Sequence, residues 1–155
     1  MKKKNMVVIG MVVGCLMMVA GAAWAGTVMP GSAYGMIKVG NLVWLKNANC
    51  FGAMEWYSAG RAAYNLKSGD CGLYDGSKAG DWRLPTKDEL NSIFASKSLF
   101  SDVQADVYWS STDDFNFLSA ATGNPSAWCV YMVDGHGNKG YKEYMNYVWP
   151  VRNGP

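Results

Sequence analysis

A capping box at residues 86–89 fixes where one helix of this chain begins. The Thr86 side chain can accept a hydrogen bond from the backbone N–H of Glu89, and the Glu89 carboxylate can reach back to the N–H of Thr86. Pro85 disfavours helical backbone in the residue before it, so the helix does not start earlier. The pattern predicts a helix over residues 87–96, with a buried stripe formed by Leu90, Ile93 and Phe94.

A hairpin and another helix are predicted closer to the N-terminus. Residues 36–39 and 42–45 are short apolar runs joined by Gly40-Asn41, and glycine at the first turn position supplies the positive φ of a type II′ turn. Residues 53–66 predict a helix, because an apolar stripe recurs at helical spacing in Trp56, Ala59, Ala63 and Leu66. Gly69 is placed to end this helix in the left-handed conformation.

The second half of the chain shows the period of two that is typical of strands. Residues 107–111, 127–133 and 147–151 predict strands, and Pro150 puts the last one at a sheet edge or at a strand end. Two polar, glycine-rich segments, residues 68–80 and 134–140, predict a loop and a turn. Strands at both ends with two helices between them favour a single α+β domain.

The N-terminal 25 residues have the pattern of a secretory signal peptide. A basic start is followed by an apolar run and by an A-x-A site, which predicts cleavage between Ala25 and Gly26. A retained membrane anchor and a lipoprotein attached through Cys15 are the alternatives. After cleavage no membrane span would remain, and residues 26–155 would form one secreted or periplasmic domain.

Charge argues against nucleic acid as a partner. The chain has 14 basic and 12 acidic residues, and three of the basic ones (Lys2, Lys3 and Lys4) leave with the signal, so the net charge of the exported part is −1. A nearly neutral domain without a basic run has no electrostatic footprint for nucleic acid.

The cysteines fit an oxidising compartment. Cys50 and Cys71 flank the first predicted helix, so we expect these two to form a disulfide, which would stabilise the domain by about 3 kcal/mol in the chain-entropy model. Cys129 lies in an apolar strand and is expected to be a buried, unreactive thiol.

Five short segments occur in an order that resembles the Lcl C-terminal domain family, named after a bacterial collagen-like adhesin. The resemblance extends from about Gly40 to Arg152 and is carried by Leu42-Val43-Trp44-Leu45-Lys46-Asn47, Gly80-Asp81-Trp82-Arg83-Leu84-Pro85-Thr86, Tyr108-Trp109-Ser110-Ser111-Thr112, Ala127-Trp128 and Val148-Trp149-Pro150-Val151-Arg152. It implies a small C-type-lectin-like α+β domain, with two helices flanking twisted antiparallel strands, a fold shared with the formylglycine-generating enzymes. It also implies export, adhesion to glycans or host surfaces, and a cysteine pair around the first helix.

Neither a catalytic site nor a metal site is predicted. Arg83, Thr86 and Glu89 are interpreted as a structural motif, because the capping box already explains the glutamate. The segment at 134–138 spaces three oxygen or nitrogen ligands but lacks the glycine and glutamate of a calcium loop. The chain has one histidine, which excludes a multi-histidine zinc site. We expect no cofactor, although Ca²⁺ would suit the acidic loop described next.

The connection at residues 112–126 is the candidate binding face, together with the turn that follows. Long connections in small domains often carry function. The predicted ligand-binding residues are polar side chains suited to sugar hydroxyls or Ca²⁺ and two tyrosines expected to be exposed: Asp113, Asp114, Asn116, Asn124, Tyr141 and Tyr144.

Three functions follow from these patterns. The first is an exported, adhesin- or lectin-like module that binds a glycan or surface polymer. The alternative is a structural or assembly protein of the cell envelope that binds a protein partner. The third is an enzyme related to the formylglycine-generating enzymes, which would need a reactive thiol in a cleft.

Overall fold

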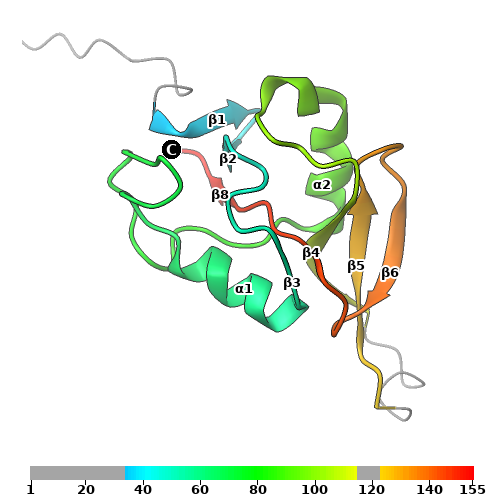
Figure 1. Ribbon diagram of the computed structural model, residues 1–155. Coiled ribbons are helices and arrows are strands. Elements are labelled where there is room, and N and C mark those ends of the chain that lie inside the picture. The colour runs from blue at the N-terminus through cyan, green and yellow to red at the C-terminus, as the bar shows by residue number, and fades with distance from the viewer. Residues whose placement is uncertain (1–33, 115–122) are drawn as a thin grey trace, which may run out of the picture.

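The computed structural model describes residues 34–114 and 123–155, which form a mixed α/β domain with a curled sheet and two α-helices (Figure 1). Cys15, Ala25, Gly26 and Asn116 lie outside these ranges. In chain order the elements are β1 (Met36–Val39), β2 (Leu42–Leu45), β3 (Ala53–Met54), α1 (Trp56–Asn65), α2 (Lys87–Ile93), the 3₁₀ helix η2 (Phe94–Leu99), β4 (Val107–Asp114), β5 (Ser126–Tyr131), β6 (Gly137–Tyr141), β7 (Asn146–Tyr147) and β8 (Val151–Asn153). No helix within the described ranges is long and apolar enough to cross a membrane.

The strands form two sheets. One has the order β1-β2-β8 and the other the order β3-β7-β4-β5-β6. The strand pairs are antiparallel as expected, except that β4 and β7 are parallel where Tyr108 pairs with Tyr147. Helix α1 packs against β4, and α2 packs against β4 and β5 (Figure 1).

The β1–β2 hairpin has the predicted register, with Val39 opposite Leu42. Gly40 has a φ of +59°, whereas Asn41 does not have a positive φ. This pattern fits the predicted type II′ turn, since a type I′ turn would need positive φ at both residues.

Helix α1 is shorter than the predicted helix at both ends. Ala53 and Met54 pair with β7 as strand β3, so the helix begins only at Trp56. At the other end Leu66 is extended, with φ −61° and ψ 131°, and buries its side chain in the core. Gly69 does have a positive φ, but it lies in the loop beyond the helix and does not cap it. The extended backbone of Leu66 therefore ends the helix, three residues before Gly69.

The capping box of α2 is present. The Glu89 N–H donates to Thr86 Oγ1 at 3.2 Å, and the Thr86 N–H donates to Glu89 Oε2 at 2.7 Å. The predicted helix over 87–96 is wrong only in its last three residues, because the chain tightens into η2 after Ile93. Residues three apart eclipse in a 3₁₀ helix. Lys97 accordingly lies 4.2 Å from the Phe94 ring centroid, and its ammonium donates to the Met132 carbonyl at 2.6 Å.

The strands of the second half are confirmed with corrected bounds. Strand β4 continues to Asp114, β5 ends at Tyr131, and the segment predicted as a turn over 134–140 contains most of β6. The predicted strand over 147–151 is divided between β7 and β8, because Trp149 leaves the ladder to enter the core.

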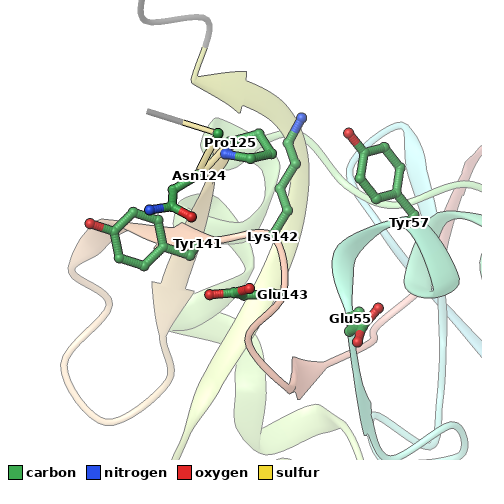
Figure 2. Close-up of a pocket in the computed structure, with 8 residues that line it drawn as sticks. Glu55, Tyr57, Asn124, Pro125, Tyr141, Lys142 and Glu143 are labelled. Atoms are coloured by element: carbon green, nitrogen blue, oxygen red, sulfur yellow. The ribbon is translucent and has the colours of Figure 1, made fainter. Parts of the chain in front are cut away.

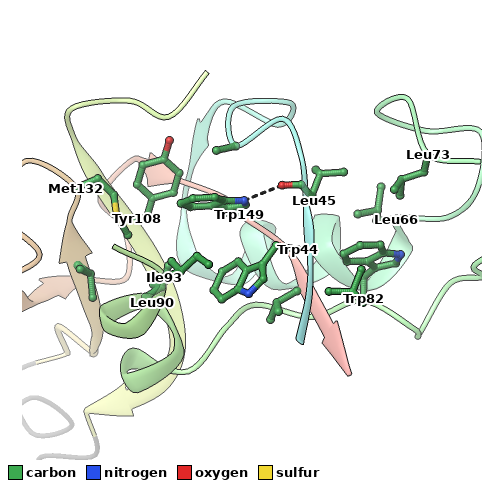
Figure 3. Close-up of a cluster of buried hydrophobic side chains, with 14 residues drawn as sticks. Trp44, Leu45, Leu66, Leu73, Trp82, Leu90, Ile93, Tyr108, Met132 and Trp149 are labelled. Carbon is green, nitrogen blue, oxygen red and sulfur yellow. Dashed lines mark hydrogen bonds between the residues drawn. The ribbon is translucent and has the colours of Figure 1, made fainter. Parts of the chain in front are cut away.

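An aromatic cluster occupies the centre of the domain (Figure 3). Trp149 has its ring centroid 5.4 Å from that of Trp44, 4.8 Å from Phe100 and 5.6 Å from Tyr108. Its indole N–H donates to the Leu45 carbonyl at 2.8 Å, which satisfies the polar atom of a fully buried side chain. This hydrogen bond holds the segment that precedes β8 against the end of β2.

The disulfide between Cys50 and Cys71 is confirmed, with a Cα–Cα distance of 5.9 Å. It joins the loop before β3 to the loop after α1. Among the described residues the free cysteine is Cys129, which is buried in β5. Burial raises the pKa of its thiol to about 11, so at neutral pH it is protonated.

Candidate functional site

Two of the predicted binding residues, Asn124 and Tyr141, line one pocket of about 250 Å³. We call it the tyrosine pocket. It lies where the end of β6 and the turn after it meet the start of α1 and the residues before β5 (Figure 2). Its main side chains are those of Glu55, Tyr57, Asn124, Tyr141, Lys142 and Glu143.

Two exposed tyrosines stand on opposite sides of the tyrosine pocket (Figure 2). Tyr57 is 59% exposed and comes from the first turn of α1, whereas Tyr141 is 45% exposed and ends β6. Strand alternation explains the exposure of Tyr141, since the neighbouring Gly140 faces the interior and a Cβ there would lie 3.1 Å from Trp109. Both rings are therefore available to a ligand.

Lys142 lies between the two tyrosines and is held in place by contacts of both its side chain and its backbone (Figure 2). Its side chain is only 6% exposed, its ammonium lies 2.8 Å from Asp113 Oδ2, and the same ammonium lies 4.0 Å from the centre of the Trp56 ring. Its backbone N–H donates to the Pro125 carbonyl at 2.9 Å, and its carbonyl accepts from the Trp56 N–H at 3.0 Å. One residue thus fixes β4, α1 and the start of β5 around the pocket.

The two predicted acidic ligands do not converge on a common point. Asp113 forms an ion pair with Lys142. Asp114, the next residue of β4, lies 2.9 Å from Lys139 Nζ and accepts a hydrogen bond from the Ser126 hydroxyl at 2.8 Å. Successive strand residues point to opposite faces. The hydrogen bond from Lys139, followed by that from Ser126, lowers the pKa of Asp114. Both residues belong to β4 and not to a loop, so the connection predicted over 112–126 begins only after them.

Tyr144 faces a second pocket of about 290 Å³, which Cys129, Tyr131 and Lys139 also line. Its ring packs edge-on against that of Tyr141, with 5.3 Å between the two centroids, but it does not line the tyrosine pocket. The Cys129 thiol in this second pocket donates to the Asn138 carbonyl at 3.4 Å.

His136 lies in the connection between β5 and β6. The side chain of His136 is 84% exposed and lies 3.3 Å from Asp134 Oδ2. Within residues 34–114 and 123–155, no three His, Cys, Asp or Glu side chains lie close enough to hold a metal ion together.

Arg83 and Glu89 form a bidentate salt bridge beside the capping box. Arg83 Nη1 donates to Glu89 Oε2 at 2.7 Å, and Nη2 donates to Oε1 at 2.8 Å. The hydrogen bond from Arg83 outweighs partial burial and lowers the pKa of Glu89. A carboxyl group with a depressed pKa stabilises the fold above its ordinary pKa, and this stabilisation is lost as the pH falls through the depressed value.

We expect Glu89→Gln to destabilise the domain by about 1 kcal/mol at neutral pH. The difference in unfolding free energy between wild type and variant should stay constant above the ordinary carboxyl pKa of 4.5 and shrink as the pH falls below it, because the pKa of Glu89 in the folded protein is lowered. Urea unfolding at a series of pH values measures this. Asp88→Asn is the matched control, since it removes a carboxylate from the same helical turn and leaves the ion pair intact. An unchanged difference across the series would contradict the assignment.

Sequence reasoning missed Glu55, Tyr57, Lys142 and Glu143. The pattern that predicted α1 placed Tyr57 on its outer face, and an aromatic residue there was the one available signal. The position of Lys142 was not accessible, because it depends on the pairing of β3 with β7 and of β5 with β6. These contacts join segments that are far apart in the sequence.

The chain matches one protein family and is similar in fold to solved structures. The family model described as "Lcl C-terminal domain" matches residues 38–152. A crystal structure of botrocetin superposes with a TM-score of 0.51 at 11% identity, covering 77% of this chain and 96% of botrocetin. A complex of botrocetin with a von Willebrand factor A1 domain gives a TM-score of 0.47 at 9% identity. The comparison with curated proteins gave no match. The likeness to botrocetin shows a C-type-lectin-like fold.

Proposed function

Since the chain belongs to the Lcl C-terminal domain family, we propose that it is an exported, non-catalytic module that binds a glycan or surface polymer in the tyrosine pocket. The disulfide is consistent with an extracellular or periplasmic domain. The observation that carries the proposal is the pair of exposed tyrosines facing one pocket with carboxylate and amide groups between them.

The side chains of the tyrosine pocket match the chemistry of a sugar. A sugar ring has an apolar face of C–H groups, which packs well against an aromatic ring such as that of Tyr57 or Tyr141. Its hydroxyls donate to carboxylates, which Glu55 and Glu143 supply, and exchange hydrogen bonds with an amide such as Asn124. A few convergent polar groups beside aromatic walls are the usual composition of a ligand site.

The walls of the pocket are preorganised. Lys142 is held by an ion pair, a cation–π contact and two backbone hydrogen bonds, so this part of the wall keeps its position without a ligand. Little ordering entropy is then lost when a ligand binds.

A glycan array probed with the protein purified from cells expressing the full chain tests this proposal. Tyr141→Ala and Tyr57→Ala should each weaken binding of the best glycan about tenfold or more, because exposed tyrosines that pack on a ligand are typical hot spots. Tyr74→Ala is the matched control, since Tyr74 is a more exposed tyrosine that does not line the tyrosine pocket. Equal affinity of all three variants and wild type would refute the site.

We expect glycan binding to survive chelation of divalent cations. Asp113 and Asp114 are each paired with a lysine, so neither carboxylate is free to complete a calcium site. Repeating the array measurement with a chelator gives the result, and loss of binding would point to a metal site that this proposal does not contain.

A further inference from the structure

A second and chemically different groove runs along the outer face of α1. It has a volume of about 550 Å³ and lies between this helix, the segment before α2 and Ser111 of β4. We call it the helix groove. Its principal side chains are Trp56, Tyr57, Arg61, Tyr64, Trp82 and Leu84.

The helix groove is built mainly from apolar and aromatic surface. Trp82 and Leu84 are buried at its floor, whereas Tyr57 and Tyr64 are exposed at its sides. These tyrosines are seven residues apart, which places them two turns apart on the same helix face. The Tyr64 ring lies against Gly80, where an added Cβ would be 3.5 Å from it. Tyr57 also borders the tyrosine pocket, so the two sites share one wall.

Gly60 lies between the tyrosines, in the middle of α1, where glycine is unfavourable for a helix. Its backbone does not need positive φ, and a Cβ built there would meet no atom within 4 Å. Nothing in the described fold therefore requires glycine at this position. The missing side chain instead leaves the floor of the helix groove open between the two rings.

The rim of the helix groove carries one positive charge without a partner in the described residues. Arg83 is neutralised by Glu89 through two hydrogen bonds. The Arg61 side chain is exposed and has no hydrogen bond or ion pair to residues 34–114 or 123–155. A ligand with a carboxylate next to an apolar group would complement this arrangement.

We propose that the helix groove binds a short segment of a partner protein, which inserts one aromatic or leucine side chain over Gly60 and places an adjacent Asp or Glu against Arg61. Tryptophan, tyrosine and arginine together are the composition enriched in the hot spots of protein interfaces. The apolar lining separates this site from the tyrosine pocket, whose carboxylates and amide suit hydroxyl groups. The partner segment and the glycan are therefore recognised by different side chains, apart from Tyr57, which lines both sites.

Amide NMR titration of the protein purified from cells expressing the full chain tests this inference with three blocked peptides. The probes are Ac-Gly-Asp-Trp-Gly-NH2, its neutral analogue with Asn in place of Asp, and its analogue with Gly in place of Trp. We expect the first to shift the Gly60, Arg61 and Leu84 amides and to bind at least fivefold more tightly than the second, and the third not to bind. Equal binding of the three peptides, or no shift along α1, would overturn the proposal.

Three variants separate the helix groove from the tyrosine pocket. Gly60→Leu should fill the helix groove and weaken binding of the first peptide at least tenfold, while glycan binding persists. Gly60→Ala is the matched control: its melting temperature should be unchanged or raised, and it should lose less affinity for the first peptide than Gly60→Leu. Arg61→Gln should abolish the preference for the Asp peptide over the Asn peptide. The proposal is wrong if Gly60→Leu removes glycan binding and leaves peptide binding intact. Loss of glycan binding in Tyr141→Ala with peptide binding retained would support two separate sites.

Discussion

Trp149→Ala is expected to destabilise the domain by about 3–5 kcal/mol, the cost of deleting a large buried aromatic ring. The ring contacts those of Trp44, Phe100 and Tyr108, and its N–H satisfies the Leu45 carbonyl. Small domains have a total stability of about 5–15 kcal/mol, so this variant would lose a large part of it. Urea unfolding followed by far-UV circular dichroism measures the change.

Trp149→Phe separates the two contributions of this residue. It keeps most of the aromatic packing but removes the hydrogen bond to Leu45, so the loss should be smaller than in Trp149→Ala. Tyr74→Ala controls for removal of an aromatic ring at the surface and should change stability by less than about 0.5 kcal/mol. A Trp149→Ala variant that unfolds like the Tyr74→Ala protein would show that the aromatic cluster is not the centre of the core.

Asp75→Ala is the second substitution with a large expected effect, about 3–5 kcal/mol of lost stability. The Asp75 side chain is 1% exposed, and its Oδ2 lies 3.2 Å from Arg152 Nη2. Its other oxygen accepts from the Ser77 N–H at 3.1 Å and from the Ser77 hydroxyl at 2.7 Å. Removing the carboxylate leaves a half-buried guanidinium without its counter-charge and two donors without an acceptor.

The double variant Asp75→Leu with Arg152→Met tests the reason for this loss. Replacing both charges by apolar groups removes the unpaired charge, so the double variant should be more stable than Asp75→Ala. Chemical unfolding of the two variants and wild type gives the comparison. If the double variant were less stable than Asp75→Ala, the explanation by an unpaired buried charge would be wrong. The ion pair itself would then account for the lost stability.

Local signals in the sequence were sufficient where a few neighbouring residues decide the structure. Thr86 and Glu89 determine the start of α2 without help from the rest of the fold, and Gly40 determines the turn between β1 and β2. The disulfide could also be predicted, because Cys50 and Cys71 flank one predicted helix whereas Cys129 lies in an apolar strand.

Distant contacts explain the elements that the sequence did not specify. Ala53 and Met54 favour helix by propensity, but pairing with Asn146 and Tyr147 turns them into a strand. The same long-range packing brings Tyr57 opposite Tyr141 and so forms the tyrosine pocket. The candidate site could be predicted only in part for this reason: Asn124 and Tyr141 were identified, and the residues contributed by α1 were not.

The register of the β1-β2-β8 sheet determines how the domain responds to mechanical tension. Met36, where β1 begins, lies opposite Leu45, and Asn153, where β8 ends, lies opposite Leu42. The chain therefore enters the sheet at one end of β2 and leaves it at the other. A pulling force applied between these two points acts along the strands, and it loads the hydrogen bonds of both ladders together instead of opening them one by one.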